Sequence, residues 1–313
     1  MLYNVRTIMN KSIVLNNGQV IPSIGLGTWK SDKNKVGDAV YYAVTDADYR
    51  HVDCAAVYGN EKEIGNAFKK IFEGNKVKRE EVFVTSKLWN TEHDPALVEK
   101  ACRMTLADLQ LEYLDLYLVH WGIAFPHGGD IEPMGEDGLV KTVPVPLIDT
   151  WRAMEKLVEK GLVKSLGVAN YTIPMIVDLL AYSKIKPVMN QIEVHPYNSQ
   201  TELVEFCHKM GIAVTAYSPF GSQGKEKDKP INNPEIAKIA VAHNMTPAQI
   251  LVGWLNQRGI VTIPKSVNHD RIKANLDVFN FELTPSEMDL IAKLNKGHRF
   301  VDPIDWWGIP YFK

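Results

Sequence analysis

The stretch LYLVH (residues 116–120) is a short apolar run that ends in a polar residue, a histidine. Seven other short apolar runs in the chain also have a polar residue at or next to their C-terminal end. Each run is followed by a segment with the apolar periodicity of an amphipathic helix. The other runs are SIGLGT (23–28), RHVDC (50–54), VFVTSK (82–87), SLGVAN (165–170), PVMNQI (187–192), AVTAYS (213–218) and GIVTIPK (259–265). Eight strands alternating with helices predict parallel strands with right-handed crossovers, closed into a barrel. We therefore expect one α/β domain over residues 1–313, a (β/α)8 TIM barrel.

Three segments do not fit this alternation of strands and helices. SIVLNNGQVIP (12–22) predicts a hairpin turning at Asn17-Gly18, which we expect to plug the bottom of the barrel. Residues 121–147 are rich in Gly and Pro, and the tail from 297 carries Trp306, Trp307 and Tyr311. Long irregular loops in a compact domain are usually binding loops or lids, so both are expected at the site. Residues 1–8 are expected to be a flexible extension.

Several helix ends carry recognisable signals. The pairs Asn60 with Glu63, Thr246 with Gln249 and Thr284 with Glu287 have the spacing of capping boxes, and Pro follows both threonines. Gly161 and Gly211 come just after helical stretches, where a left-handed residue is needed. These signals predict where the helices between the strands begin and end.

Composition excludes several classes of function. The 313 residues carry a net charge of −2, so no basic excess is available to neutralise a nucleic-acid backbone. No apolar run approaches a membrane span, and the N-terminus lacks a signal-peptide core. The three cysteines, Cys54, Cys102 and Cys207, fit neither a disulfide framework nor a zinc ribbon. We expect a cytoplasmic protein with reduced thiols, no metal, no nucleic-acid or membrane partner, and a small-molecule substrate.

Polar residues end all eight runs. In a parallel barrel these ends converge on one face, and that face carries the active site. The residues are Thr28, Asp53, Lys87, His120, Asn170, Gln191, Tyr217 and Lys265. Because structure alone rarely needs eight such endings, the pattern predicts a catalytic site at the barrel mouth.

Asp53, Lys87 and His120 end three successive strands, and Tyr58 follows Asp53 closely. The ordinary pKa of a tyrosine is about 10, too high for easy proton donation near neutrality. A nearby ammonium lowers the pKa of a phenol, and a carboxylate keeps that ammonium charged. Tyr58 could then act as a general acid to a carbonyl oxygen while hydride reaches the carbon.

Other interpretations of these residues remain open. Asp53 and Lys87 could form a structural ion pair, His120 a hydrogen-bonded core histidine, and Tyr58 a packed loop residue. Lys87 could also be a Schiff-base nucleophile acting on sugar phosphates. Their joint placement at adjacent strand ends favours the general-acid interpretation.

The later strands favour a dinucleotide site. The amides of Asn170 and Gln191 could pair with a carboxamide, and Tyr217 offers a flat face for stacking. Lys265, Ser266 and Arg271 surround a predicted helix start, which is a natural phosphate site, although ordinary surface charge there is the alternative. Gly25-Leu-Gly27 lacks the third glycine of a dinucleotide fingerprint, so the binding mode is not of the Rossmann type.

From about Ser12 to the C-terminus the chain resembles the aldo-keto reductase family. The motifs that carry the resemblance are DYRHVD (48–53) before AAVYGNE (55–61), TSKLW (85–89), LDLYLVHW (114–121), and IPKS (263–266) with Arg271 and Asn275. The chain departs from the family in two places. The family usually has serine where this chain has Ala169, and the loop after Ser218 is shorter in this chain than in many members of the family. Within the family the chain is similar to mannose-6-phosphate reductases, sorbitol-6-phosphate dehydrogenases and xylose reductases, through residues 180–197 and 299–310.

The resemblance implies NADPH-dependent reduction of aldehydes or aldoses, aldose phosphates included, with NADH as the alternative cofactor. It implies Tyr58 as acid/base, Lys87 and Asp53 as the residues that tune it, and His120 as the residue that orients the carbonyl. It implies cofactor contacts from Thr28, Trp29, Asp53, Asn170, Gln191, Tyr217, Ser218, Ser222, Lys265, Ser266, Arg271 and Asn275. It implies a substrate pocket of Trp29, Tyr58, His120, Trp121 and Trp306. Members include monomers and homodimers, and some relatives are non-catalytic binding proteins, which is the alternative function here.

Overall fold

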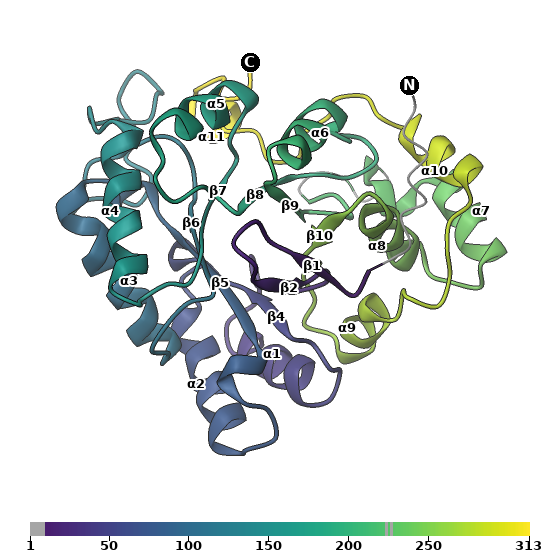
Figure 1. Ribbon diagram of the computed structural model, residues 1–313. Coiled ribbons are helices and arrows are strands. Elements are labelled where there is room, and N and C mark those ends of the chain that lie inside the picture. The colour runs from purple at the N-terminus through teal and green to yellow at the C-terminus, as the bar shows by residue number, and fades with distance from the viewer. Residues whose placement is uncertain (1–9, 223–224, 226–227) are drawn as a thin grey trace.

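The eight predicted strands form one parallel sheet that curls into a barrel (Figure 1). The computed structural model describes residues 10–222, 225 and 228–313. The strands are β3 (Leu26–Gly27), β4 (His51–Asp53), β5 (Phe83–Leu88), β6 (Leu116–Val119), β7 (Leu166–Ala169), β8 (Met189–Glu193), β9 (Ala213–Tyr217) and β10 (Ile260–Thr262). They lie in chain order, and the parallel bridges Ile24–Thr262 and Gly27–Lys265 join the first strand to the last. The predicted (β/α)8 barrel is confirmed.

Helices surround the barrel, as the amphipathic segments predict. They are α1 (Val36–Thr45), α2 (Glu61–Glu73), α3 (Pro95–Leu109), α4 (Leu147–Glu159), α5 (Ile173–Tyr182), α6 (Thr201–Lys209), α7 (Pro234–Ala242), α8 (Pro247–Gln257), α9 (His269–Leu276), α10 (Pro285–Ala292) and the short α11 (Ile304–Trp307). Their apolar faces and the outward faces of the strands share the largest cluster of buried side chains. Among the described residues, no helix is long and apolar enough to cross a membrane.

The N-terminal hairpin closes the bottom of the barrel. β1 (Ser12–Val14) pairs antiparallel with β2 (Val20–Pro22), and Gly18 turns between them with a φ of 87°. Leu15 and Ile21 pack against barrel residues such as Phe83 and Met189 in a separate buried cluster. This apolar plug leaves the opposite, carboxyl end of the strands as the open face of the barrel.

Most predicted helix ends are confirmed. Thr246 with Gln249 and Thr284 with Glu287 form capping boxes, and Gly161 and Gly211 have φ values of 69° and 71°. The box predicted for Asn60 and Glu63 is wrong. Asn60 Nδ2 instead donates to the Thr28 carbonyl at 3.0 Å, and the Glu63 carboxylate accepts from backbone amides of residues 34 and 37. Both side chains therefore bind segments that are distant in the sequence instead of capping the helix.

The two irregular segments meet at the barrel mouth. The loop after β6 and the tail around α11 supply an aromatic cluster in which Trp121, Phe125 and Trp307 are buried. The rings of Trp121 and Trp307 are 5.1 Å apart, and the Trp307 indole donates to Glu132 at 3.2 Å. The prediction that these segments lie at the site is therefore confirmed, whereas the prediction for residues 1–8 lies outside the described residues.

Candidate active site

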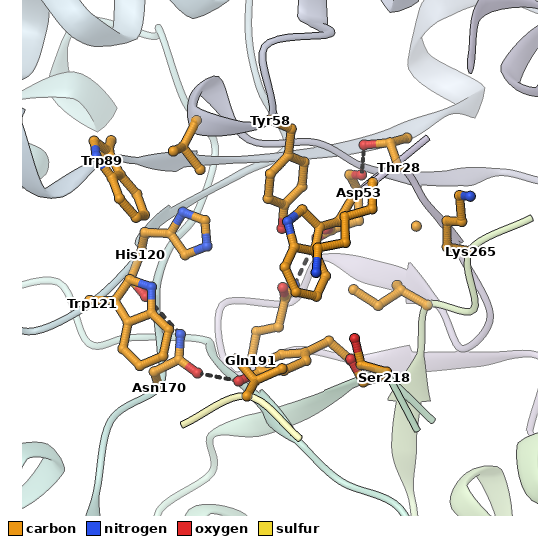
Figure 2. Close-up of a pocket in the computed structure, with 18 of the residues that line it drawn as sticks. Thr28, Asp53, Tyr58, Trp89, His120, Trp121, Asn170, Gln191, Ser218 and Lys265 are labelled. Carbon is orange, nitrogen blue, oxygen red and sulfur yellow. Dashed lines mark hydrogen bonds between the residues drawn. The ribbon is translucent and has the colours of Figure 1, made fainter. Parts of the chain in front are cut away.

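A cavity of about 620 Å³ opens at the carboxyl ends of the strands. Figure 2 shows Trp89, His120 and Trp121 on one side of it and Ser218 and Lys265 on the other. The residues predicted for the site that line it are Thr28, Trp29, Asp53, Tyr58, His120, Trp121, Asn170, Gln191, Tyr217, Ser218, Ser222, Lys265 and Trp306. Trp89, His120 and Trp121 thus face Ser218 and Lys265 across the cavity (Figure 2).

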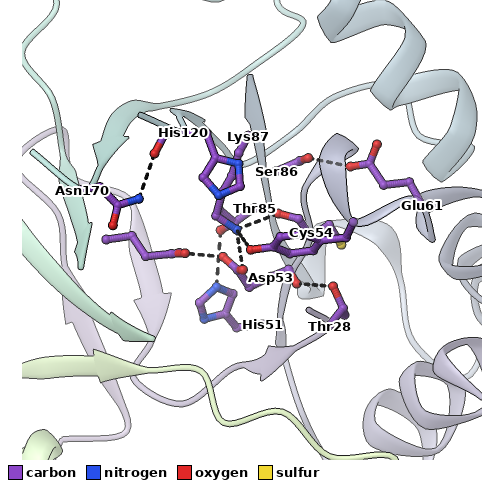
Figure 3. Close-up of polar contacts among 12 residues, drawn as sticks. Thr28, His51, Asp53, Cys54, Glu61, Thr85, Ser86, Lys87, His120 and Asn170 are labelled. Carbon is purple, nitrogen blue, oxygen red and sulfur yellow. Dashed lines mark hydrogen bonds and ion pairs between the residues drawn. The ribbon is translucent and has the colours of Figure 1, made fainter. Parts of the chain in front are cut away.

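Lys87 lies directly behind this cavity and is fully buried. Its Nζ donates to Asp53 Oδ1 at 2.6 Å and to the Cys54 carbonyl at 2.8 Å (Figure 3). It also donates to the Tyr58 hydroxyl at 3.3 Å. The ammonium thus has an oxygen acceptor for each of its protons. The strand register explains the contact with Asp53, because β4 and β5 are neighbours in the parallel sheet.

The charges of this group are set by burial and by each other. Burial alone would lower the pKa of Lys87, but Asp53 and then Tyr58 raise it above its ordinary value. Burial raises the pKa of Tyr58 to about 12, and Lys87 opposes that rise. At neutral pH the site therefore holds an ammonium, a carboxylate partner and a phenol that keeps its proton.

Asp53 is held from several sides. Its Oδ2 accepts from Gln191 Nε2 at 2.7 Å, and its carbonyl accepts from the Thr28 hydroxyl at 2.7 Å. Asn60 binds the Thr28 carbonyl in turn, which ties the start of α2 to the end of β3. Four of the eight strand-end residues, Thr28, Asp53, Lys87 and Gln191, therefore form one connected network.

His120 faces the cavity beside Tyr58. The two rings are 5.9 Å apart and nearly perpendicular, and the Trp89 ring packs on the other side of the imidazole at 5.2 Å. Burial lowers the pKa of His120 well below its ordinary value, and the charge on Lys87 lowers it further. His120 is therefore neutral near pH 7, and its ring can donate a single hydrogen bond.

Asn170 and Tyr217 form the opposite wall. The Tyr217 hydroxyl donates to Asn170 Oδ1 at 2.8 Å, and Asn170 Nδ2 donates to the His120 carbonyl at 3.0 Å. Asn170 has a φ of 64° and Ser218 a φ of 50°, so the chain turns sharply just after β7 and β9. These turns aim the amide at the cavity and start the loop at Ser218 along its edge.

The aldo/keto reductase family model matches residues 23–296, which contain all eight strands of the barrel. The chain belongs to the aldo-keto reductase family. It is 52% identical over 298 residues to "Aldo-keto reductase family 1 member A1" of Gallus gallus, covering 93% of this chain and 91% of that protein. It is 51% identical to "Aldose reductase B" of Dictyostelium discoideum, covering 93% and 94% of the two chains. The solved aldose reductase of Schistosoma japonicum superposes with a TM-score of 0.91 at 43% identity, covering 97% and 99%.

Family membership makes the protein an oxidoreductase, as the motifs predict. It agrees with the strand-end pattern, since the motifs that carry the resemblance supply Asp53, Tyr58, Lys87 and His120. The finer likeness to sugar-phosphate reductases and xylose reductases stays a prediction.

Three residues predicted for the cofactor do not line the cavity of this aldo-keto reductase. Ser266 is buried and shares hydrogen bonds with the backbone of Asn268, the residue that caps α9. Arg271 lies exposed in the first turn of α9, and Asn275 is buried further along that helix. Their roles therefore stay predictions, for a ligand that extends past Lys265 onto α9.

Sequence reasoning missed several lining residues. Trp89 was visible in a quoted motif, but tryptophan is more often packing than a ligand contact, whereas Trp307, which the sequence predicted as a possible wall of the pocket, does line the cavity. Val57, Ile131 and Glu132 come from segments without a usable pattern, and a fold was needed to place them. The complete set of missed residues is Gly27, Lys30, Val57, Trp89, Ile131, Glu132, Pro219, Phe220, Gly221, Ile263 and Val301.

Proposed function

We propose that this aldo-keto reductase reduces aldehydes and aldoses to alcohols with NADPH, using Tyr58 as the general acid. The observation that carries the proposal is the buried Lys87 ammonium, held by Asp53 and 3.3 Å from a tyrosine hydroxyl that lines the cavity. The names of the relatives, aldose reductases among them, support the same substrate class.

Reduction of a carbonyl needs a hydride at carbon and a proton at oxygen. When bound, NADPH would supply the hydride. Tyr58 holds its proton at neutral pH and would give it from its hydroxyl to the carbonyl oxygen. The phenolate left behind would be stabilised by the adjacent Lys87 ammonium, which Asp53 keeps charged. A proton from solvent then restores the phenol.

His120 and the tryptophans would orient the substrate. A neutral imidazole beside Tyr58 can donate one hydrogen bond to the same carbonyl oxygen, which would fix the direction of attack. Trp29, Trp121 and Trp306 line the cavity and give apolar surfaces on which a sugar or an aromatic ring can lie.

The polar residues that line the cavity fit a nicotinamide dinucleotide. The Asn170 and Gln191 amides and the Tyr217 ring line one continuous cavity, which suits a carboxamide on a flat heterocycle. Lys265 is exposed at the far side and pairs with no carboxylate among the described residues, so it is available to a phosphate. Arg271 and Ser266 would receive the adenosine 2′-phosphate and Asn275 the adenine, which is why NADPH is proposed over NADH.

The Schiff-base alternative has less support. A nucleophilic lysine must lose its proton, but Asp53 and Tyr58 raise the pKa of Lys87. All three of its protons also have acceptors. Aldose phosphates remain a proposed substrate subclass. A cytoplasmic location and a monomeric or dimeric state remain predictions.

The deciding experiment follows NADPH absorbance at 340 nm with glyceraldehyde, xylose, glucose 6-phosphate and mannose 6-phosphate. We expect turnover by the natural protein, and a loss of kcat of about 10²–10⁴-fold in Tyr58→Phe, because phenylalanine keeps the ring but removes the acid. Binding of NADPH, read from protein fluorescence, should be retained in the variant.

The ranking of the four substrates identifies the preferred class, and a preference for the two phosphates would establish the aldose-phosphate subclass. An absence of turnover with every member, despite measurable NADPH binding, would reject the reductase and favour a non-catalytic binding protein.

A further inference from the structure

The C-terminal tail forms a wall of the cavity through Val301, Trp306 and Trp307. A buried carboxylate holds the start of that tail, next to Arg299, whose guanidinium donates to Gln200 Oε1 at 3.0 Å, and His298, whose amide donates to the Tyr197 carbonyl at 2.9 Å. Glu193 Oε1 accepts from the backbone amide of Phe300 at 2.7 Å, and Glu193 Oε2 accepts from that of Val301 at 3.1 Å. The tail is thus attached to the barrel at the residue where it joins the cavity wall.

Glu193 is itself rigidly placed. It is the last residue of β8, pairs in register with Tyr217 of β9, and is fully buried. His195 Nε2 lies 2.8 Å from Glu193 Oε1, and the Asn198 and Gln200 amides donate to the Glu193 carbonyl at 3.2 and 2.9 Å. The carboxylate therefore cannot follow the tail if the tail moves.

A buried carboxylate is costly unless hydrogen-bond donors surround it, and charge-assisted hydrogen bonds are about twice as strong as neutral ones. The two tail amides are two of the donors that satisfy Glu193. Because the amides belong to consecutive residues, both bonds form only in one orientation of the tail. The fixed carboxylate thereby sets the direction in which Val301 enters the cavity and the start of the path to the tryptophans, while Trp307 is held further along by the Val140 amide at 2.9 Å and by Glu132 at 3.2 Å.

We propose that Glu193 is a positioning residue that sets substrate specificity by fixing this tail wall. The inference rests on the reductase function proposed above. It concerns substrates large enough to reach the tail, such as aromatic aldehydes, rather than the smallest aldehydes. Asp53, Tyr58, Lys87 and His120 stand on other strands and loops, with no described hydrogen bond to the tail. Loosening the tail should therefore leave proton donation in place.

The test compares Glu193→Gln with natural protein, using NADPH with glyceraldehyde and with 4-nitrobenzaldehyde. Glutamine keeps the size of the side chain but removes its charge and turns one acceptor into a donor that faces a backbone amide. We expect KM for the aromatic aldehyde to rise about tenfold or more, from the loss of a charge-assisted bond, and kcat/KM for glyceraldehyde to change less than about threefold.

Glu155→Gln is a matched control. Glu155 is also buried, and its Oε1 accepts from two consecutive backbone amides, those of Lys184 and Ile185, at 2.7 and 2.8 Å. It lies in α4, on the outside of the barrel, and does not line the cavity. A general loss of packing would affect both variants alike, whereas the proposal expects the substrate-dependent effect in Glu193→Gln alone.

Trp306→Ala adds a second variant that does not alter the buried carboxylate. If Glu193 acts through the tail, the two changes together should raise KM for the aromatic aldehyde by less than the product of the single effects. Full multiplication of the effects, an equal loss with both substrates, or an equal effect of Glu155→Gln would each overturn the proposal.

Limited proteolysis separates this inference from the function on which it rests. Cleavage within residues 300–313 should be faster in Glu193→Gln than in the natural protein or Glu155→Gln, whether or not any aldehyde is turned over. Unchanged cleavage would reject the positioning role of Glu193. If the natural protein shows no turnover, the proposed function is rejected, but the proteolysis result still tests whether Glu193 holds the tail.

Discussion

Lys87 has no contact with solvent, yet it carries a charge because three oxygens accept its protons. Such a group is stable only as part of its network, since an ammonium or a carboxylate left alone in the interior would be far more costly. The same network surrounds Tyr58. The charge state and the pKa of each residue in this network therefore depend more on its neighbours than on the type of side chain.

Replacing Lys87 by Met should damage stability and activity together. It leaves the Asp53 carboxylate buried with the Gln191 amide as its remaining side-chain partner, which should cost about 3–5 kcal/mol of the free energy of unfolding. Without the ammonium the pKa of Tyr58 should rise further, and the activity should fall at least about a hundredfold. Urea unfolding and kcat/KM measure the two effects.

Lys160→Met is the control for that change, because Lys160 pairs with Glu99 on the surface. Surface ion pairs contribute little, so stability and kcat/KM should both stay close to the natural values. Equal stability losses in the two variants would contradict the assigned role of the buried network.

At this scale the sequence predicts which residues meet but not how strongly they perturb each other. The strand-end rule brings Asp53 and His120 to the cavity that Tyr58 also lines, and it places Lys87 directly behind that cavity. Lys87 acts to lower the pKa of Tyr58, as expected, but burial outweighs this effect and raises that pKa to about 12. Burial depends on the packing of distant loops, which the local sequence does not contain.

Among the elements, β3 is the shortest strand of the barrel, and its closure with β10 depends on a glycine. A Cβ added at Gly27 would lie 2.6 Å from the Ile263 carbonyl oxygen, a rigid backbone atom. Gly27 also bridges to Lys265 at the edge of the cavity. The junction of β3 with β10, where the barrel closes, is called the seam here, and it therefore runs through the site itself.

Gly27→Ala should push the seam apart. We expect a loss of about 1–3 kcal/mol in the free energy of unfolding and weaker NADPH binding, since Lys265 moves with the strand. Gly129→Ala is the control, because a Cβ at Gly129 meets no atom within 4 Å. Thermal unfolding and fluorescence titration of NADPH measure both quantities, and unchanged behaviour of Gly27→Ala would refute the steric account.

Elements with a regular period are predictable here, and irregular ones are not. All eight strands follow from their apolar runs, and two capping boxes follow from local spacing. The path of residues 121–147 has no such period, so Ile131 and Glu132 could not be placed at the cavity. The mistaken box at Asn60 has the same origin, because its partner, Thr28, belongs to another strand.

At the scale of the whole molecule, burial opposes protonation of His51, His93 and His120, which lie in different parts of the described chain. Burial lowers the pKa of His51 to about 4 and that of His93 to about 3, and it lowers the pKa of His120 well below its ordinary value. In the unfolded chain each has an ordinary pKa near 6.5. As the pH falls below 6.5 the unfolded state takes up protons that the folded state does not, so stability is lost on acidification.

Glu61 opposes this trend in part. Burial raises its pKa to about 7, so its stabilising contribution is greatest at low pH and disappears as the pH rises through 7. Between about pH 4.5 and 6.5 it offsets one of the three histidines. Among these four groups the balance is two protons in favour of the unfolded state, and His208, whose pKa burial also lowers, adds to the same trend.

We therefore expect the free energy of unfolding to fall by roughly 3 kcal/mol per pH unit between about pH 6 and 5, at roughly 1.4 kcal/mol for each proton. Urea unfolding at several pH values measures the slope. His93→Phe should reduce this slope by the contribution of about one proton, roughly 1.4 kcal/mol per pH unit. A stability that does not change over this range would contradict the neutral state of the buried histidines.

The overall architecture is the most predictable level of this protein, because eight repeats of one pattern allow few arrangements. The hairpin plug, the barrel and the position of the site all follow from the sequence. The size of the cavity and the attachment of the tail to Glu193 do not, because they arise where loops from different repeats meet.

The seam between β3 and β10 joins a strand made early in synthesis to one made late. While the ribosome is still translating the middle of the chain, β3 has only one of its two neighbours, and its open edge is exposed to other chains. The barrel can close only after Lys265 has emerged. Chaperone binding to nascent chains should therefore persist until late in translation, and prematurely terminated chains should be inactive and prone to aggregate.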